Sequence, residues 1–305
     1  MDSFINLHVH SLYSKQDAVI KINELVDKVI EYGQNAVAIT DHSSTAAHYY
    51  LDKVCKEKNV KPIFGNEFYT NLSYANKTRD RNHLVCLGMT DEGVRNINRL
   101  QDIAVHNRYY KPIVSHEILP DYTEGIFATS ACSLGIVAQS ILNDKFDEAI
   151  DYCNWFNDIF DGNFALELQL HPDYIAQYVI NNSLIEISEK TDIPLTISSD
   201  AHFLMEEDTD LRKAIQCIAW HSLYKDGNNS LKSNCLGNSD IIRKNLELCN
   251  SNKNYLPIDS DIIEKAIKQT SIIAHKCNGH LCSSDRKVPI FSKYEEFDRL
   301  FDEVV

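Results

Sequence analysis

Two histidines near the start of the chain stand in a pattern that suits a metal site. His8 and His10 are separated by one residue, and Asp17 follows shortly afterwards. In an extended strand alternate side chains point the same way, so both imidazoles would project from one face. Imidazole and carboxylate groups are common ligands of divalent metals. A lone His-x-His pair is weak evidence, and support has to come from the rest of the sequence.

That support comes from polar residues at or near the ends of predicted strands. Binding sites of barrels and open α/β sheets form where the carboxyl ends of strands meet. His83 is the exception, because it begins its strand, and its loop or a reversed strand must bring it round. Each residue alone has an ordinary explanation, such as a turn or a buried thiol, but their coincidence favours a site. The candidate ligands are His8, His10, Asp17, His42, Glu67, His83, Cys132, Asp200 and His202.

The elements that must position these residues alternate along the chain as in parallel α/β proteins. Strands are predicted over residues 4–8, 36–40, 62–69, 83–88, 125–129, 164–168 and 194–198. Helices are predicted over 22–30, 45–57, 90–104, 146–160, 174–190, 210–223 and 262–277, and polar loops over 71–81 and 226–239. Seven strands with helices between them fit a closed barrel or an open sheet.

Composition limits the classes of protein to consider. The 305 residues are 44% hydrophobic and 24% charged, which is ordinary for a globular chain. The net charge of −14 argues against a broad nucleic-acid-binding surface, although bound cations would reverse the local sign at a phosphate site. Nine cysteines without a framework spacing suit a reducing compartment. No membrane span or signal peptide is evident, so a cytoplasmic protein without a membrane partner is expected.

The stretches that carry the candidate ligands together resemble the PHP (polymerase and histidinol phosphatase) family. The likeness is greatest to the N-terminal PHP domain of bacterial DNA polymerase III alpha subunits. The matching stretches are Leu-His-Val-His-Ser, Ala-Ile-Thr-Asp-His ending at His42, Lys-Pro-Ile-Phe-Gly-Asn-Glu ending at Glu67, His83-Leu84, Ser-Ala-Cys ending at Cys132, Glu-Leu-Gln-Leu-His ending at His171, and Ser-Asp-Ala-His ending at His202. Further matches after residue 210 extend the resemblance over nearly the whole chain.

The resemblance implies an α/β fold, a distorted seven-stranded (β/α) barrel over residues 1–235, with a helical C-terminal extension over 236–305. It also implies three divalent metal ions, of zinc, manganese or iron. By position, one ion would be held by His8, His10, Glu67 and Asp200. Glu67 would bridge to a second, held also by His83 and Cys132, and the third would be held by Asp17, His42 and His202. The predicted catalytic residues are Asp200, His202 and His171.

Other polar residues have weaker assignments. Asp41 would orient His42, or would be an ordinary solvated turn residue. His171 would reach the substrate or simply cover the barrel mouth. The candidate phosphate-binding cations are Lys15, Arg79, Arg81, Arg108 and Lys111. A second cluster of His275, Cys277, His280 and Cys282 has spacing too cramped for a usual structural zinc site and is discounted.

Three functions remain open from the sequence. The foremost is a metal-dependent 3′–5′ exonuclease acting on DNA ends, because the resemblance to the polymerase branch is close. The second is a phosphatase or phosphodiesterase acting on a small phosphoester. The third is a catalytically silent scaffold that binds replication proteins, and the complete ligand set counts against it. The chain stops about where the palm of an alpha subunit would begin, so it is not expected to polymerise DNA.

Overall fold

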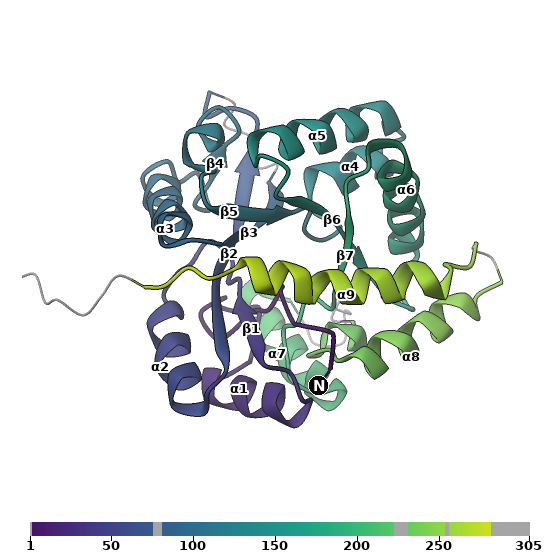
Figure 1. The fold of residues 1–305 in the computed structure, drawn as a ribbon, viewed down its shortest axis with the longest axis horizontal. Helices are drawn as coiled ribbons and strands as arrows, with labels where there is room; N and C mark the ends of the chain where they lie inside the picture. The colour runs from purple at the N-terminus through teal and green to yellow at the C-terminus, as the bar shows by residue number, and fades with distance from the viewer. Residues whose placement is uncertain (1, 76–80, 223–230, 254–255, 282–305) are drawn as a thin grey trace, which may run out of the picture.

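A computed structural model describes residues 2–75, 81–222, 231–253 and 256–281. Its centre is a curled, mixed seven-stranded sheet whose strands follow the order β1-β2-β3-β5-β6-β7, with β4 paired to β2. The strands are β1 (Ala36–Ile39), β2 (Lys61–Asn71), β3 (Asn82–Gly88), β4 (Val114–Ser115), β5 (Ile126–Thr129), β6 (Phe164–Gln169) and β7 (Leu195–Ser198). Helices surround the sheet (Figure 1). The expected α/β fold with a barrel-like sheet is confirmed.

The helices follow the predicted pattern, with two additions. They are α1 (Ile22–Glu31), α2 (His48–Lys58), α3 (Asp91–His106), α4 (Ile136–Leu142), α5 (Phe146–Ile159), α6 (Ile175–Thr191), α7 (Thr209–Trp220), α8 (Ser239–Asn250) and α9 (Ser260–Lys276). Short 3₁₀ turns occur at η1 (Leu119–Tyr122), η2 (Glu206–Asp208) and η4 (Lys232–Asn234). The sequence did not predict α4 or α8. Asn238 caps α8 by accepting a hydrogen bond from the Ile241 amide. No described helix has the length and apolar character that a membrane crossing requires.

The predicted first strand, residues 4–8, is not a ladder strand. This segment is extended, but Asn6 pairs with Val37 beside β1, whereas Val9 pairs with Ala201 beyond β7. Each pairing is an isolated β-bridge rather than a continuous run of paired residues, because the segment passes from one neighbouring strand to the other. Its position between β1 and β7 nevertheless connects the two outer strands of the curled sheet. The seventh strand is instead the two-residue β4, which the sequence did not predict.

Strand β3 runs against its neighbours. It is antiparallel to both β2 and β5, whereas β1–β2, β5–β6 and β6–β7 are parallel pairs. The amino end of β3 therefore lies beside the carboxyl end of β2, where Tyr69 faces His83. Of the two arrangements predicted for His83, a loop or a reversed strand, the structure shows the reversed strand.

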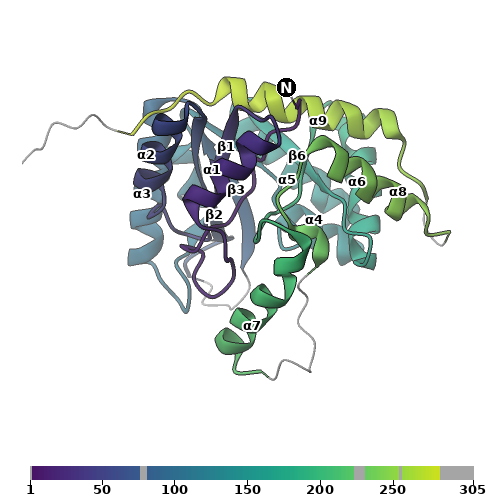
Figure 2. The same ribbon diagram turned by 90° about the horizontal axis from the view of Figure 1, so that it is seen from below.

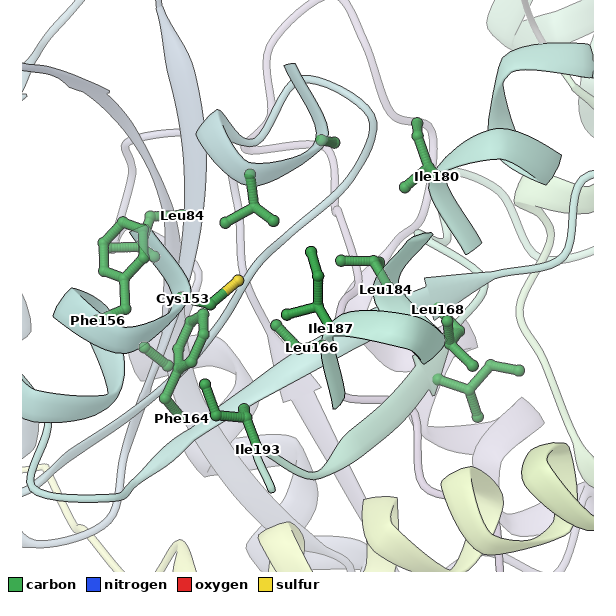
Figure 3. Close-up of a cluster of buried hydrophobic side chains, with 14 of the residues drawn as sticks. Leu84, Cys153, Phe156, Phe164, Leu166, Leu168, Ile180, Leu184, Ile187 and Ile193 are labelled. Carbon is green, nitrogen blue, oxygen red and sulfur yellow. The ribbon is translucent and has the colours of Figure 1, made fainter. Parts of the chain in front are cut away.

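Successive side chains along each strand point to opposite faces of the sheet, and each face contributes to a different hydrophobic core. On β6, Phe164, Leu166 and Leu168 point outward into the large cluster that contains α5 and α6 residues (Figure 3). A smaller cluster includes Val85, Leu87 and Phe127 and fills the inside of the curl. Residues in register with this inner set, such as His83 and Glu167, consequently face inward as well.

The helix α9 lies across the amino ends of the parallel strands. Lys61, which starts β2, donates from its Nζ to the Ala274 carbonyl, and Lys276 reaches Asn163 just before β6. The Ile5 amide donates to Thr270 Oγ1. Figure 2 shows α9 along one side of the molecule and α7 protruding from the opposite side. The carboxyl ends of the parallel strands are therefore left for a site.

Candidate metal centre

Glu67 lies at the centre of the candidate site, and each of its oxygens faces two histidines. Oε1 is 3.3 Å from His8 Nε2 and 2.8 Å from His83 Nδ1. Oε2 is 3.3 Å from His10 Nε2 and 2.7 Å from His42 Nδ1. The side chain is only 1% exposed. The carboxylate therefore spans two groups of potential ligands, as a bridging ligand would.

Asp200 completes the group around the first two histidines. Its Oδ1 lies 3.2 Å from Nε2 of His8 and 3.2 Å from Nε2 of His10. The backbone of Asp200 has a φ of 48°, which is uncommon for a residue other than glycine. Its carbonyl accepts hydrogen bonds from Asn234 Nδ2 and His202 Nδ1. These bonds hold the strained turn that aims the carboxylate at the histidines.

Asp17 forms a second meeting point. Its Oδ2 lies 3.0 Å from His42 Nε2 and 3.1 Å from His202 Nε2. Its Oδ1 accepts hydrogen bonds from Arg212 Nη2 and Gln216 Nε2, both on α7. One oxygen of Asp17 is thus engaged by α7, and the other faces the histidines.

Cys132 lies on the far side of Glu67. Its Sγ is 3.4 Å from His83 Nδ1 and 3.7 Å from Glu67 Oε1. All nine predicted ligands are therefore brought together. Among the described residues, three sets of potential ligand atoms lie within 4.8 Å of one another: His8-His10-Asp200, His42-Glu67-His83 and His10-His42-His202. His42 therefore lies within ligand distance of Glu67 as well as of Asp17. The assignment of the nine residues to three separate ions stays a prediction.

The hydrogen bonding of the buried polar atoms indicates whether the site suits cations. Buried polar atoms are normally hydrogen-bonded. Here five buried atoms lie 2.7–3.3 Å from one another as imidazole–carboxylate pairs but lack the geometry of hydrogen bonds: Nε2 of His8 and His10, Nδ1 of His42, Oε2 of Glu67 and Oδ1 of Asp200. Burial by itself would raise the pKa of Glu67, but the charges of His83, His42 and His8 hold that pKa well below its usual range. Such a set of imidazole and carboxylate atoms fits divalent cations.

Glu167 supports His8 from behind, and the sequence reasoning missed it. Its Oε1 lies 2.7 Å from His8 Nδ1, and the carboxylate also accepts hydrogen bonds from Gln169, Ser198 and Thr129. Burial lowers the pKa of His8, but the surrounding carboxylates, Glu167 first, outweigh it and raise that pKa well above its usual range. A cation binding at Nε2 would therefore displace a proton. The sequence contained one signal for this role, because Glu167 is a carboxylate within the predicted strand 164–168, whose other residues are apolar.

Asp41 supports a different histidine from the one predicted. Its carboxylate accepts hydrogen bonds from the backbone amide and hydroxyl of Ser11 and from the hydroxyl of Ser14. The Ser14 Oγ lies 2.9 Å from His10 Nδ1. Asp41 is fully buried, so it is no solvated turn residue. It orients His10 through Ser14, and the Ser14 hydroxyl also accepts a hydrogen bond from the His42 amide.

His171 lies beside the site rather than among the nine. Its Nδ1 is 2.8 Å from Ser233 Oγ, and its Nε2 is 3.2 Å from Gln169 Oε1. Burial lowers the pKa of His171 to about 4, so the ring is neutral near neutral pH. Its predicted catalytic role stays a prediction.

The remaining predicted cations and the second cluster are partly outside the described residues. Arg79 and Cys282 lie there. Lys15, Arg108 and Lys111 are exposed, and Arg81 is partly buried. In the discounted cluster, Cys277 is buried in the inner core and His280 pairs with Asp91, which gives no further support to a metal site.

Comparison with known proteins identifies the family. A family model described as the PHP domain matches residues 6–171, more than half of the chain and a span that contains seven of the nine candidate ligands. The chain belongs to the PHP domain family. This PHP chain is 32% identical to the DNA polymerase III subunit alpha of Borreliella burgdorferi over 282 residues, which cover 90% of the chain and 24% of that relative.

Further relatives have the same name. The DNA polymerase III subunit alpha of Aquifex aeolicus is 36% identical over 217 residues, 67% of this PHP chain and 19% of that relative. The chain thus spans about a fifth to a quarter of the length of these relatives. Among solved structures, a two-domain protein from Bacteroides vulgatus that contains a predicted PHP-like metal-dependent phosphoesterase aligns with a TM-score of 0.36 and 12% identity. That alignment covers 65% of this chain and 52% of the other.

Proposed function

We propose that the chain is a metal-dependent phosphoesterase. The observation that carries the proposal is the convergence of imidazole and carboxylate atoms, buried and without hydrogen-bond partners, around the Glu67 carboxylate. The close approaches among these atoms lack the geometry of hydrogen bonds, and divalent cations bound between them would satisfy the atoms. Membership of the PHP family supports the same reading.

The predicted ligands have distinct tasks in this proposal. His8, His10 and Asp200 would hold one cation, His83 and Cys132 a second, and Glu67 would serve both. Asp17, His42 and His202 would hold the third. Bound divalent cations lower the pKa of a water to near neutrality and neutralise charge on phosphoryl oxygens. Glu167 and the Asp41–Ser14 pair keep the His8 and His10 rings aimed into the site.

We further propose that the substrate is the 3′ end of a DNA strand and that the reaction is exonucleolytic hydrolysis. The support is the repeated match to DNA polymerase III alpha subunits, which covers 90% of this chain in one relative and 97% in another. A small phosphoester is the second candidate substrate. It is favoured by the acidic balance of the chain, whose net charge is −14.

The test compares substrates and variants of the 305-residue chain. Hydrolysis is measured with Mn²⁺, using single-stranded DNA labelled to report 3′-end release, p-nitrophenyl phosphate and bis-p-nitrophenyl phosphate. The Asp200→Ala/His202→Ala double variant removes two predicted ligands, and we expect its hydrolysis to fall at least about a hundredfold. Asp158→Ala removes an exposed carboxylate from α5 and is the matched control.

The outcomes separate the hypotheses. Release of nucleotides from DNA that disappears in the double variant supports the exonuclease. Turnover of the small esters alone supports the phosphatase. Failure to hydrolyse any of these substrates with Mn²⁺, Zn²⁺ or Fe²⁺ would overturn the phosphoesterase proposal and favour the scaffold.

A further inference from the structure

A lysine lies one aromatic ring away from the candidate metal ligands. The Nζ of Lys111 is 5.6 Å from the centre of the Tyr69 ring. That ring also contacts His42, stacked on it at 5.5 Å between centroids, and His83, in edge contact at 5.1 Å. Tyr69 thus connects an exposed cation to two of the nine predicted ligands.

The segment that carries Lys111 forms a tight turn at the mouth of the curled sheet. It follows α3 and precedes β4, which pairs with Thr70 and Asn71 directly after Tyr69. The amides of Tyr109 and Lys111 donate to each other's carbonyls, so Tyr110 lies at the tip of the turn.

The tip presents an aromatic ring to solvent. Tyr110 is 55% exposed and packs edge-on against Tyr109, with ring centroids 4.8 Å apart. Its φ is 62°, a left-handed conformation that a tyrosine adopts only when its surroundings impose it. Arg108 Nε donates to the Tyr110 carbonyl and helps to hold this conformation. The ring is therefore displayed in a fixed position beside the lysine.

A cation next to an exposed aromatic ring is a combination that suits single-stranded nucleic acid. Lysine neutralises a backbone phosphate, and a tyrosine ring stacks on a base of any identity. The chain carries a net charge of −14, so a polyanion needs local positive charge to approach the site. Arg212, a second cation near the ligands, is already engaged with Asp17.

We propose that residues 108–111, together with Tyr69, form a subsite for single-stranded nucleic acid. Lys111 binds the backbone phosphate next to the one at the metal centre, and Tyr110 stacks on the adjoining base. The inference rests on the proposed phosphoesterase and names its substrate class. A small phosphoester has neither a second phosphate nor a base for these residues to bind.

The charge of Lys111 is tested by the salt dependence of binding. The probe is a fluorescein-labelled oligothymidylate with phosphorothioate linkages, which resist hydrolysis, and fluorescence anisotropy gives its dissociation constant from about 50 to about 200 mM salt. A contact with one phosphate of a single strand contributes about 0.7 to the slope of log K against log salt concentration. We expect Lys111→Ala to lower the slope by that amount and Lys111→Arg to retain it.

The matched control removes a lysine from the opposite side of the molecule. Lys265 is exposed on α9, which lies across the amino ends of the strands. We expect Lys265→Ala to leave the slope unchanged. Equal slopes for the parent, Lys111→Ala and Lys265→Ala would overturn the phosphate contact.

The stacking contact is tested independently of charge. We expect Tyr110→Ala to weaken binding by about tenfold at every salt concentration, with no change in slope, and Tyr110→Phe to retain parental binding. Binding by Tyr110→Ala that matches the parent would overturn the stacking contact. Hydrolysis of bis-p-nitrophenyl phosphate by the parent, measured in parallel, reports on the phosphoesterase itself. If the parent hydrolyses the ester but neither Lys111→Ala nor Tyr110→Ala alters oligonucleotide binding, the subsite is refuted and the phosphoesterase is not. If the parent hydrolyses no ester but both variants alter binding as expected, only the phosphoesterase is refuted.

Discussion

At the scale of single residues, the site depends on carboxylates behind the histidines as much as on the histidines themselves. Glu167 fixes His8 directly, and Asp41 fixes His10 through Ser14. The sequence predicted which histidines converge, because strand-end positions and motif stretches locate them. It could not predict their supports, since His8 and Glu167 are 159 positions apart in the sequence and only the fold brings them together.

The Glu167 support gives a residue-scale prediction. Glu167→Gln keeps the size of the side chain but removes the negative charge that holds His8 Nδ1. We expect the affinity for Mn²⁺ to fall about 10- to 100-fold, as outer-shell substitutions typically cause. Isothermal titration of the chelator-treated protein measures this change. Glu189→Gln, on the exposed face of α6, is the control, and equal affinities of the two variants would refute the role of Glu167.

At the scale of elements, α7 is joined to the site by one of its faces. Arg212 and Gln216 are four residues apart, so they share a helix face, and both donate to Asp17. Arg212 also donates to the Asp17 carbonyl and to Asn234. The helix therefore fixes the carboxylate so that only its Oδ2 faces His42 and His202.

The prediction for α7 concerns the geometry of that clamp. Arg212→Lys keeps the charge but loses the planar fork that reaches Asp17 and Asn234 together. We expect one class of bound Mn²⁺ to weaken about tenfold or more while the others are retained, as measured by titration and by counting bound ions after gel filtration. Arg243→Lys alters an arginine that pairs with Glu264 on the exposed surface, and it should bind metal as the parent does. Uniform weakening at all sites would argue against a local clamp.

The sequence predicted most elements correctly, and its errors have physical causes. Residues 4–8 have the composition of a strand, but they divide their hydrogen bonds between two neighbours. β4 is only two residues long, and its pairing with β2 depends on tertiary contact rather than on local pattern. The helix α8 lies just after a stretch rich in Gly and Asn, whose composition favours a loop.

At the scale of the whole molecule, the two ends of the curled sheet have different tasks. One end carries the polar site, and α9 covers the other, with Ile273, Ala274 and the following residue Cys277 in the inner core. Ile263 and Ile267 of the same helix join the large outer core. The C-terminal helices thus share both cores with the sheet, while the predicted domain boundary after residue 235 stays a prediction.

The prediction at this scale uses two neighbouring residues of α9. Ile267 is fully buried, whereas Lys268 is exposed on the same turn. We expect Ile267→Ala to lower the free energy of unfolding by about 2–5 kcal/mol, because it leaves a cavity beneath the sheet. Lys268→Ala should change it by less than about 0.5 kcal/mol. Urea denaturation measures both values, and equal stability of the two variants would mean that α9 is not packed as described.

The pairing of Val9 with Ala201 places the first and last parts of the candidate metal centre side by side. His8 and His10 are synthesised long before Asp200 and His202, so a nascent chain cannot bring all the candidate ligands together until residue 202 has emerged from the ribosome. Contacts this distant in sequence raise the contact order and slow folding. A cation that binds only when all these ligands are assembled stabilises the native state and not the unfolded chain. Metal binding would therefore stabilise the chain only after the long-range pairing of Val9 with Ala201 has formed.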